Sequence, residues 1–338
     1  MKSNNNQNQN VRLGLAILGG FIFALILIPK LAITFMISPD TNETDSQIAD
    51  FSGENFGLPS STTAPASMPT VYITLYRDAI GQFQEIEFEQ YLIGVVAAEM
   101  PALFAPAALQ AQAIAARTYA MRILEHYDYL VDTKMHQVFF DNDQLRDRWG
   151  VDFEHHLATI TAAVESTRGL VLKYNNELIT PMFFAMSSGA TENSEEVFTT
   201  ARPYLRSVAS LGYMHLDNFA VSERFTITEL QEIFNDNQVT TSNIMILAHS
   251  TGGNIAEVRF GNKIYTGREV RELLGLRSAS FSLVIDVVAN IVTITSYGHG
   301  HGVGMSQHGA NVMAQNGYSY EAILQHFYQN VVIENKQD

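Results

Sequence analysis

Residues 88–101 have the sequence FEQYLIGVVAAEMP, in which large apolar side chains recur at steps of three and four. This spacing predicts a helix with one apolar face, because residues three and four apart lie on the same side of a helix. The residues of that face are Phe88, Tyr91, Leu92, Val95 and Val96. We expect the helix to run from about residue 89 to residue 99 and to end at Pro101, since proline breaks the helical hydrogen bonding.

Glu99 lies on the same apolar face, one turn beyond Val95 and Val96. A carboxyl group there should be partly desolvated, and desolvation raises a carboxyl pKa because it penalises the charged form. An acid that keeps its proton near neutral pH suits cleavage of a glycosidic bond, in which the leaving oxygen must be protonated. The alternative is a frayed helix end that exposes Glu99 to solvent.

The rest of the chain mixes helices and strands without regular βαβ alternation, which predicts an α+β fold with a groove. A hairpin around Gly81 is expected before the first helix, from strands at 71–76 and 83–88. Further helices are expected at 106–126, 151–167, 225–235 and 266–275, the last capped by Thr266 and ended by Gly275. Strands are expected at 170–174, 179–187 and 331–333, with hairpins at 259–265 and 284–296 and two short helices before the last strand.

Composition excludes several classes of protein. The chain has 338 residues, 46% of them hydrophobic, so it is long enough for a substantial core and is not intrinsically disordered. Its formal charge of -15 argues against a nucleic-acid partner. It has no cysteine, which excludes disulfide scaffolds, thiolate zinc sites and cysteine nucleophiles.

The N-terminal 68 residues differ from the rest. Residues 11–37 are almost entirely apolar and long enough to cross a bilayer, so we expect an uncleaved transmembrane anchor after a cytoplasmic head at 1–10. Basic residues precede the anchor and acidic ones follow it, which places everything beyond it outside the cytoplasm. Residues 38–68 have the composition of a flexible linker, and residues 69–338 form the extracytoplasmic domain. A cleaved signal peptide and a buried core helix are the alternatives for the anchor.

Arg117 interrupts an alanine-rich helix, which is expected to be central because small residues let neighbouring backbones approach closely. An arginine in that setting needs a partner, either a polar ligand in the groove or an acid in a buried structural ion pair.

A loop rich in glycine and histidine, residues 298–310 (GHGHGVGMSQHGA), follows a predicted strand and opens a helix. Its glycines allow close approach to the backbone, and its first helical amides suit polar oxygens. His299 and His301, with His308 further on, also suggest a zinc site, although their spacing supports it weakly.

Residues 180–191 (TPMFFAMSSGAT) are expected to be a strand that runs into a turn. Ser187 and Ser188 lack the preceding glycine of a nucleophile elbow, so they should line a groove or cap the turn. Glu192, Glu195 and Glu196 are expected to be solvated turn or cap residues rather than a second catalytic acid.

Seven segments in order resemble the stage II sporulation protein D family: YLIGVVAAEMP, AQAIAARTYAMR, MHQVFF, FFAMSSGATENSEEVF, PYLRSVAS, TGREVRELLGLRS and YGHGHGVGMSQHGANVMA. The resemblance spans about residues 70–333. It implies a lytic transglycosylase that cleaves the MurNAc–GlcNAc β-1,4 bond of peptide-stripped peptidoglycan during engulfment in endospore formation. The enzyme would act between the mother-cell and forespore membranes, beside a cell-wall amidase partner.

The same resemblance implies roles for particular residues. It makes Glu99 the catalytic acid, and it places Arg117, Ser187, Ser188, His299, His301 and Gln307 in the substrate groove. Glu99 would protonate the leaving oxygen, and the 6-hydroxyl of the same MurNAc would close a 1,6-anhydro ring. No cofactor is implied, and the cysteine–histidine metal site of some members is not expected here, because the chain has no cysteine. Two other classes compete with this enzyme: a non-catalytic peptidoglycan-binding amidase activator and a zinc hydrolase.

Overall fold

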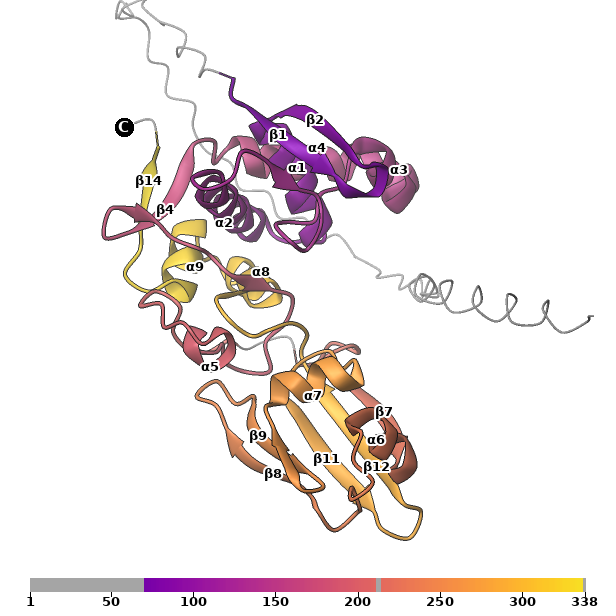
Figure 1. Cartoon of the computed structure of the whole chain (residues 1–338). Coiled ribbons are helices and arrows are strands. Elements are labelled where there is room, and N and C mark those ends of the chain that lie inside the picture. The colour runs from indigo at the N-terminus through magenta and orange to yellow at the C-terminus, as the bar shows by residue number, and fades with distance from the viewer. Residues whose placement is uncertain (1–69, 211–213, 337–338) are drawn as a thin grey trace, which may run out of the picture. The chain divides into compact units, whose positions relative to one another are not determined.

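The computed structural model describes residues 70–210 and 214–336 (Figure 1). The predicted head, anchor and linker lie outside the described residues. Within the described ranges, no helix is both long enough and apolar enough to span a membrane. The described part combines helices with several small sheets, which agrees with the predicted α+β class.

The first elements form a hairpin that leads directly into the first helix. Strands β1 (Tyr72–Arg77) and β2 (Gln82–Glu87) pair antiparallel around the 3-10 turn η1 (Asp78–Ile80), and β3 (Leu130–Val131) pairs parallel to β1. Helix α1 (Phe88–Glu99) begins where the Glu87 side chain accepts a hydrogen bond from the backbone N–H of Gln90. It ends before Pro101, because a residue that precedes proline is driven out of the helical region, and Met100 is extended with φ -123°.

Helix α2 (Pro106–Leu124) is the centre of the first core, as its small residues predict. Proline occupies its first turn, where no N–H is needed. Its alanines at 108, 111, 113, 115 and 116 are fully buried, and α1, α4 (Phe153–Glu165), α8 (Gln307–Gln315) and α9 (Tyr320–Phe327) pack around it. Helix α4 confirms the predicted helix at 151–167. Helix α3 (Asn142–Trp149) and the 3-10 turn η2 (Gly150–Asp152) before α4 were not predicted.

The middle of the chain is less regular than its apolar sequence predicts. Strand β4 (Leu170–Tyr174) is paired by β5 (Glu177–Leu178) and by the last strand, β14 (Val332–Asn335). The predicted strand at 179–187 is reduced to β6 (Phe183–Phe184), which pairs parallel to β13 (Met305–Ser306). Pro181 cannot donate a ladder hydrogen bond, and the partner strand stops after two residues where α8 begins.

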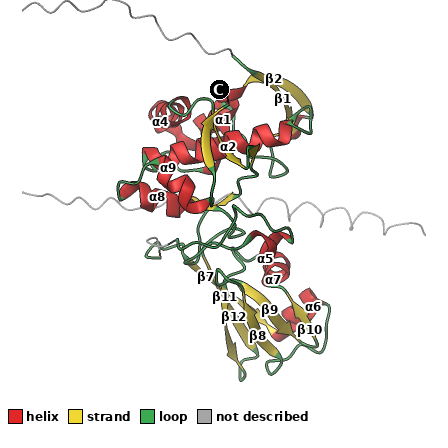
Figure 2. Cartoon of the chain, turned by 90° about the vertical axis from the view of Figure 1, so that its left-hand side faces the viewer, coloured by secondary structure: helices red, strands yellow, loops and turns green. Residues whose placement is uncertain are grey.

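A second core is built mainly from strands. Strands β11 (Phe281–Asp286), β12 (Ile291–Tyr297) and β7 (Ala220–Thr226) form one sheet. Strands β10 (Lys263–Tyr265), β9 (Ile255–Phe260) and β8 (Ile244–His249) form another, and both pack with α6 (Ile227–Phe234) and α7 (Gly267–Leu274). Figures 1 and 2 show these strands gathered at one end of the described part and α1, α2, α4, α8 and α9 at the other.

The structure both confirms and corrects the predictions for this second core. The hairpins at 259–265 and 284–296 are confirmed, as is the helix between Thr266 and Gly275. The predicted helix at 225–235 begins two residues late, because Thr226 and Glu229 form a capping box that starts α6 at Ile227, and Phe225 belongs to β7. Strand β8 was not predicted.

Candidate active site

Glu99 lines a cavity of about 480 Å³, here called the Glu99 cavity. The C-terminal end of α1, the loop before α3, the β6 segment and the glycine–histidine loop form most of its wall. The lining residues are Ala98, Glu99, Tyr119, Lys134, 136–138, 181–185, Phe198, Arg271 and 299–301. Segments that are far apart in the sequence therefore meet at one carboxyl group.

Glu99 is half-buried at the last residue of α1. Burial raises the pKa of this carboxyl, and a hydrogen bond from Gln307 together with the charges of Lys134 and Arg148 oppose that rise. The Gln307 Nε2 donates to Glu99 Oε2 at 3.4 Å. The prediction of a partly desolvated acid is confirmed, and the solvent-exposed helix end is wrong.

Glu99 is the only carboxylate among the residues that line this cavity, all of which lie in the described ranges. Two cations, Lys134 and Arg271, line it with Glu99. The wall of the cavity thus carries one acid, whose pKa is raised, and its other residues are neutral or positive. This arrangement can deliver a proton, but it offers no second carboxylate to act as nucleophile or base.

The glycine–histidine loop reaches the cavity through His299 and His301, as expected. The Nε2 of His301 donates to the Phe183 carbonyl at 3.0 Å, and its Nδ1 accepts the Val303 N–H at 3.1 Å. Burial lowers the pKa of His301 to about 4, so the ring is neutral at pH 7. Because both ring nitrogens are hydrogen bonded, neither is available as a metal ligand in this conformation.

His299 is anchored differently. Arg277 donates from Nη2 to the His299 Nδ1 at 3.3 Å, and the backbone of His299 bridges to Met186. Burial lowers its pKa, helped by the charge of Arg277. Among the described residues, no group of three or more potential ligands is placed to hold a metal ion.

Glycine is required in this loop for steric reasons. Gly300 has a φ of 119°, and a Cβ there would lie 2.7 Å from the Cβ of Phe184. The loop can therefore lie directly against β6, which holds His301 over the cavity wall. Gln307 follows as the first residue of α8, whose N-cap, Ser306, accepts the N–H of Gly309.

The structure does not bring Ser187 or Ser188 into the Glu99 cavity. Ser187 is 2% exposed, its hydroxyl donates to the Ala190 carbonyl, and it accepts the N–H of Gly189. It therefore caps the turn, which was the alternative to a groove-lining role.

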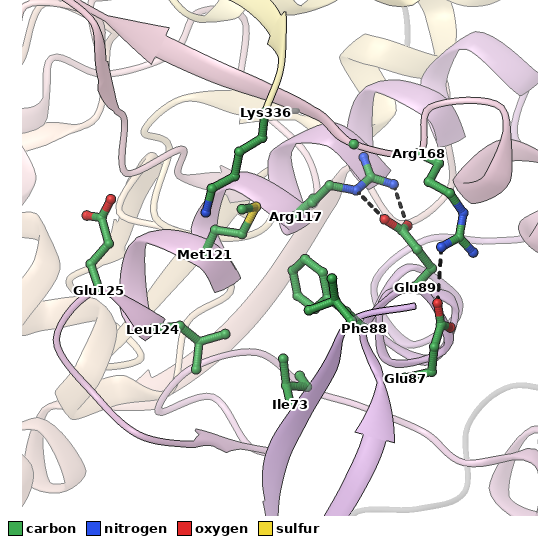
Figure 3. A pocket seen from close by; sticks show the side chains of 12 residues that line it. Ile73, Glu87, Phe88, Glu89, Arg117, Met121, Leu124, Glu125, Arg168 and Lys336 are labelled. Carbon is green, nitrogen blue, oxygen red and sulfur yellow. Dashed lines mark hydrogen bonds and ion pairs between the residues drawn. The ribbon is translucent and has the colours of Figure 1, made fainter. Parts of the chain in front are cut away.

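Arg117 is also outside the Glu99 cavity. Its Nε and Nη2 donate to the two carboxylate oxygens of Glu89 at 3.0 and 2.6 Å, and its other donors reach backbone carbonyls of α4 and β4. Figure 3 shows this pair at the side of a separate cavity, next to Phe88. Arg117 thus forms a buried structural ion pair, which was the alternative to binding a polar ligand in the groove.

Glu192 corrects another expectation. It was predicted to be solvated, but it is 1% exposed and accepts the backbone N–H groups of Gly252 and Asn254. The β-rich part folds back over residue 192, and this long-range packing has no local sequence signal. The prediction of a turn or cap residue fits Glu195, which lies in the first turn of α5 (Ser194–Phe198) and pairs with Arg206. Glu196, also in α5, accepts hydrogen bonds from Thr251.

Several cavity residues were missed from sequence, and Lys134, Gln137 and Arg271 are among them. Gln137 is 3% exposed, and its Oε1 accepts from the hydroxyl of Tyr91 at 3.2 Å. Its Nε2 has no hydrogen-bond acceptor among the described residues. A buried donor in this state is costly, because the hydrogen bond that it would make to water is not replaced. Gln137 and Arg271 lie in the quoted segments MHQVFF and TGREVRELLGLRS, and Lys134 directly precedes the first of these, but no residue pattern distinguishes them there.

Comparison with known proteins decides the family. A family model described as stage II sporulation protein matches residues 76–174. Stage II sporulation protein D of Bacillus amyloliquefaciens is 39% identical over 284 residues, which cover 81% of this chain and 80% of the relative. The chain belongs to the stage II sporulation protein D family.

Other members and relatives of the family agree with this. Stage II sporulation protein D of Bacillus subtilis (strain 168) is 39% identical over 78% of this chain and 79% of its own length. The amidase enhancer of the same strain is 28% identical over 70% of this chain but only 39% of its own length. The chain is therefore a sporulation protein with a more distant similarity to an amidase enhancer.

Proposed function

We propose that this protein is a membrane-anchored lytic transglycosylase that cleaves MurNAc-β-1,4-GlcNAc bonds in peptide-stripped peptidoglycan strands. The observation that supports it best is Glu99, a half-buried carboxyl with a raised pKa and the only carboxylate in its cavity. Membership of a sporulation family supports peptidoglycan remodelling during engulfment as the setting.

Glu99 is the general acid of the proposed reaction. Its proton passes to the glycosidic oxygen as the bond to C1 of MurNAc breaks, and GlcNAc leaves with a free hydroxyl. The positive charge at C1 is then trapped by the 6-hydroxyl of the same MurNAc, which gives a 1,6-anhydro end. The Glu99 carboxylate takes the proton of that hydroxyl, so the acid is regenerated and no water is consumed.

A single carboxylate is sufficient because the nucleophile belongs to the substrate. Most glycosidases need a pair of carboxylates, one of which acts as nucleophile or activates a water molecule. An intramolecular hydroxyl already lies close to C1, so proximity replaces the second group. The hydrogen bond from Gln307 orients the carboxyl of Glu99, and Gln137 Nε2 offers a donor to a sugar oxygen.

The proposal includes the location of the enzyme. Residues 11–37 anchor it, residues 1–10 lie in the cytoplasm, and the domain works between the mother-cell and forespore membranes. There it acts beside a cell-wall amidase, which removes the stem peptides. This part is supported by the apolar and charged pattern of the N-terminal sequence and by the similarity to an amidase enhancer.

The test is product analysis with the purified full chain. Peptide-stripped glycan strands should yield 1,6-anhydro-MurNAc ends by mass spectrometry, and Glu99→Gln should lower the rate by about 100-fold or more, the usual share of a general acid. Glu257→Gln is the matched control, because Glu257 is an exposed acid on β9 away from the cavity. Unchanged cleavage by Glu99→Gln would remove Glu99 as the acid.

The second candidate is a non-catalytic module that binds peptidoglycan and activates an amidase, which the amidase enhancer relative favours. In that case the wild-type chain binds strands and stimulates an amidase without forming anhydro ends, and Glu99→Gln stimulates equally well. A zinc hydrolase, the third class, predicts activity that is lost to a chelator and restored by zinc. The two hydrogen-bonded ring nitrogens of His301 do not favour it.

A further inference from the structure

Arg271 lies where two cavities adjoin. It projects from α7, in the second core, and lines the Glu99 cavity. It also lines a cavity of about 270 Å³ beside α7, here called the α7 cavity. Phe198 and His301 are the other residues common to both walls. A chain of sugars that extends from Glu99 toward the α7 cavity therefore passes Arg271.

The guanidinium of Arg271 has unused hydrogen-bonding capacity. Its Nε donates to the Leu276 carbonyl at 3.3 Å, and within the described ranges no carboxylate forms an ion pair with it. One turn away, Arg268 is paired with Glu272 at 2.9 Å. Arg271 is half-buried, and a partly desolvated cation without a hydrogen-bonded ion-pair partner is costly. Its planar fork of donors matches a carboxylate.

Within the described ranges none of the neighbouring acids forms an ion pair with Arg271, although the charge of Glu272 favours its cationic form. Glu192 and Glu196 line the α7 cavity but accept hydrogen bonds from residues 251–254, and Glu272 is held by Arg268. On the other side, the only acid among the residues that line the Glu99 cavity is Glu99, and within the described ranges it forms no ion pair with Arg271. Lys134 adds a further positive charge to the same cavity. The Glu99 cavity thus carries two cations, Lys134 and Arg271, beside its single candidate acid.

We propose that Arg271 binds the lactyl carboxylate of a muramyl residue and thereby selects strands without stem peptides. This inference rests on the proposed function. The lactyl group is an anion only when it is not linked to a peptide, because an amide bond removes the charge. The reaction that supplies the substrate is therefore hydrolysis of the lactyl amide, which consumes water and releases the carboxylate and an amine.

The experiment compares two glycans that differ only in this charge. Peptide-stripped strands are used as such or after conversion of their lactyl carboxylates to methylamides, and the full chain is assayed for kcat/KM by anhydro-end formation. Wild type should prefer the carboxylate strands by about tenfold or more, the low end for hydrogen bonds to a charged group. Arg271→Gln should cleave both strands at the wild-type methylamide rate, and Arg271→Lys should keep part of the preference.

Controls separate this inference from its alternatives. Arg224→Gln removes the same charge from an exposed position on β7 and should leave the preference intact. A preference that survives in Arg271→Gln, or that is lost in Lys134→Gln instead, overturns the proposal. Failure of the proposed function looks different, because the wild-type chain then produces no anhydro ends from either strand. Binding of the two strands to Glu99→Gln, with and without Arg271→Gln, still measures charge recognition in that case.

Discussion

Replacing Arg117 by methionine would leave the Glu89 carboxylate buried without its cation. Glu89 is 4% exposed and Arg117 is 1% exposed, and their two hydrogen bonds form a bidentate pair. Arg117 also donates to the carbonyls of Val164 and Leu170, so its loss removes these two hydrogen bonds and leaves the buried oxygens of Glu89 without their donors. The position therefore combines two of the most destabilising changes known, an unpaired buried charge and unsatisfied acceptors.

The expected cost is about 3–5 kcal/mol of unfolding free energy, as measured when one partner of a buried ion pair is removed. For a domain of this size that corresponds to a fall in Tm of roughly 6–10 °C. Glu89→Met should cost a similar amount. The double variant should lose less unfolding free energy than the sum of the losses in the two single variants, because it leaves neither charge unpaired.

Thermal melts of the full chain, followed by circular dichroism, measure these values. The kcat/KM for anhydro-end formation, measured at a temperature well below each Tm, shows whether substrate binding changes. If Arg117→Met leaves the Tm unchanged while kcat/KM falls, Arg117 contacts the substrate and our structural interpretation is wrong. If the Tm falls and activity per folded molecule is retained, the ion pair has a structural role alone.

Two further predictions concern the candidate site. Because Glu99 must be protonated to act, kcat/KM should fall as pH rises through its raised pKa; Gln307→Leu removes a hydrogen bond that lowers this pKa and should shift that fall to higher pH. A pH profile that is unchanged or shifted to lower pH would contradict this assignment. Gln137→Leu should lower kcat/KM by about tenfold, since it removes a donor that has no partner in the described residues, and it should also lower the Tm, because the buried Tyr91 hydroxyl loses its acceptor. Gln112→Leu is its matched control, because Gln112 is equally buried and unpartnered but lies outside the Glu99 cavity, so an equal loss of activity in both variants would refute the role of Gln137.

Local sequence patterns were sufficient to predict most helices and strands, and the position of Glu99 on an apolar helix face. The apolar periodicity of residues 88–101, the proline at the start of α2 and the capping residues around α7 act over one or two helical turns, and the structure contains all three. The errors occur where pairing partners are distant. Whether residues 179–187 pair as a strand depends on β13, more than 100 residues away, and β8 is recognised only through its partner β9.

The sequence by itself determined that the chain is α+β, that Glu99 lies on an apolar helix face and that the histidine loop is glycine-rich for steric reasons. Only the tertiary structure decided which polar groups meet. It placed Arg117 against Glu89, buried Glu192 beneath residues 252–254, and brought Lys134, Gln137 and Arg271 to the wall beside Glu99. The physical reason is that helix periodicity, capping and backbone sterics act between near neighbours in the chain. The partner of a buried charge is chosen by packing between segments that are far apart in sequence.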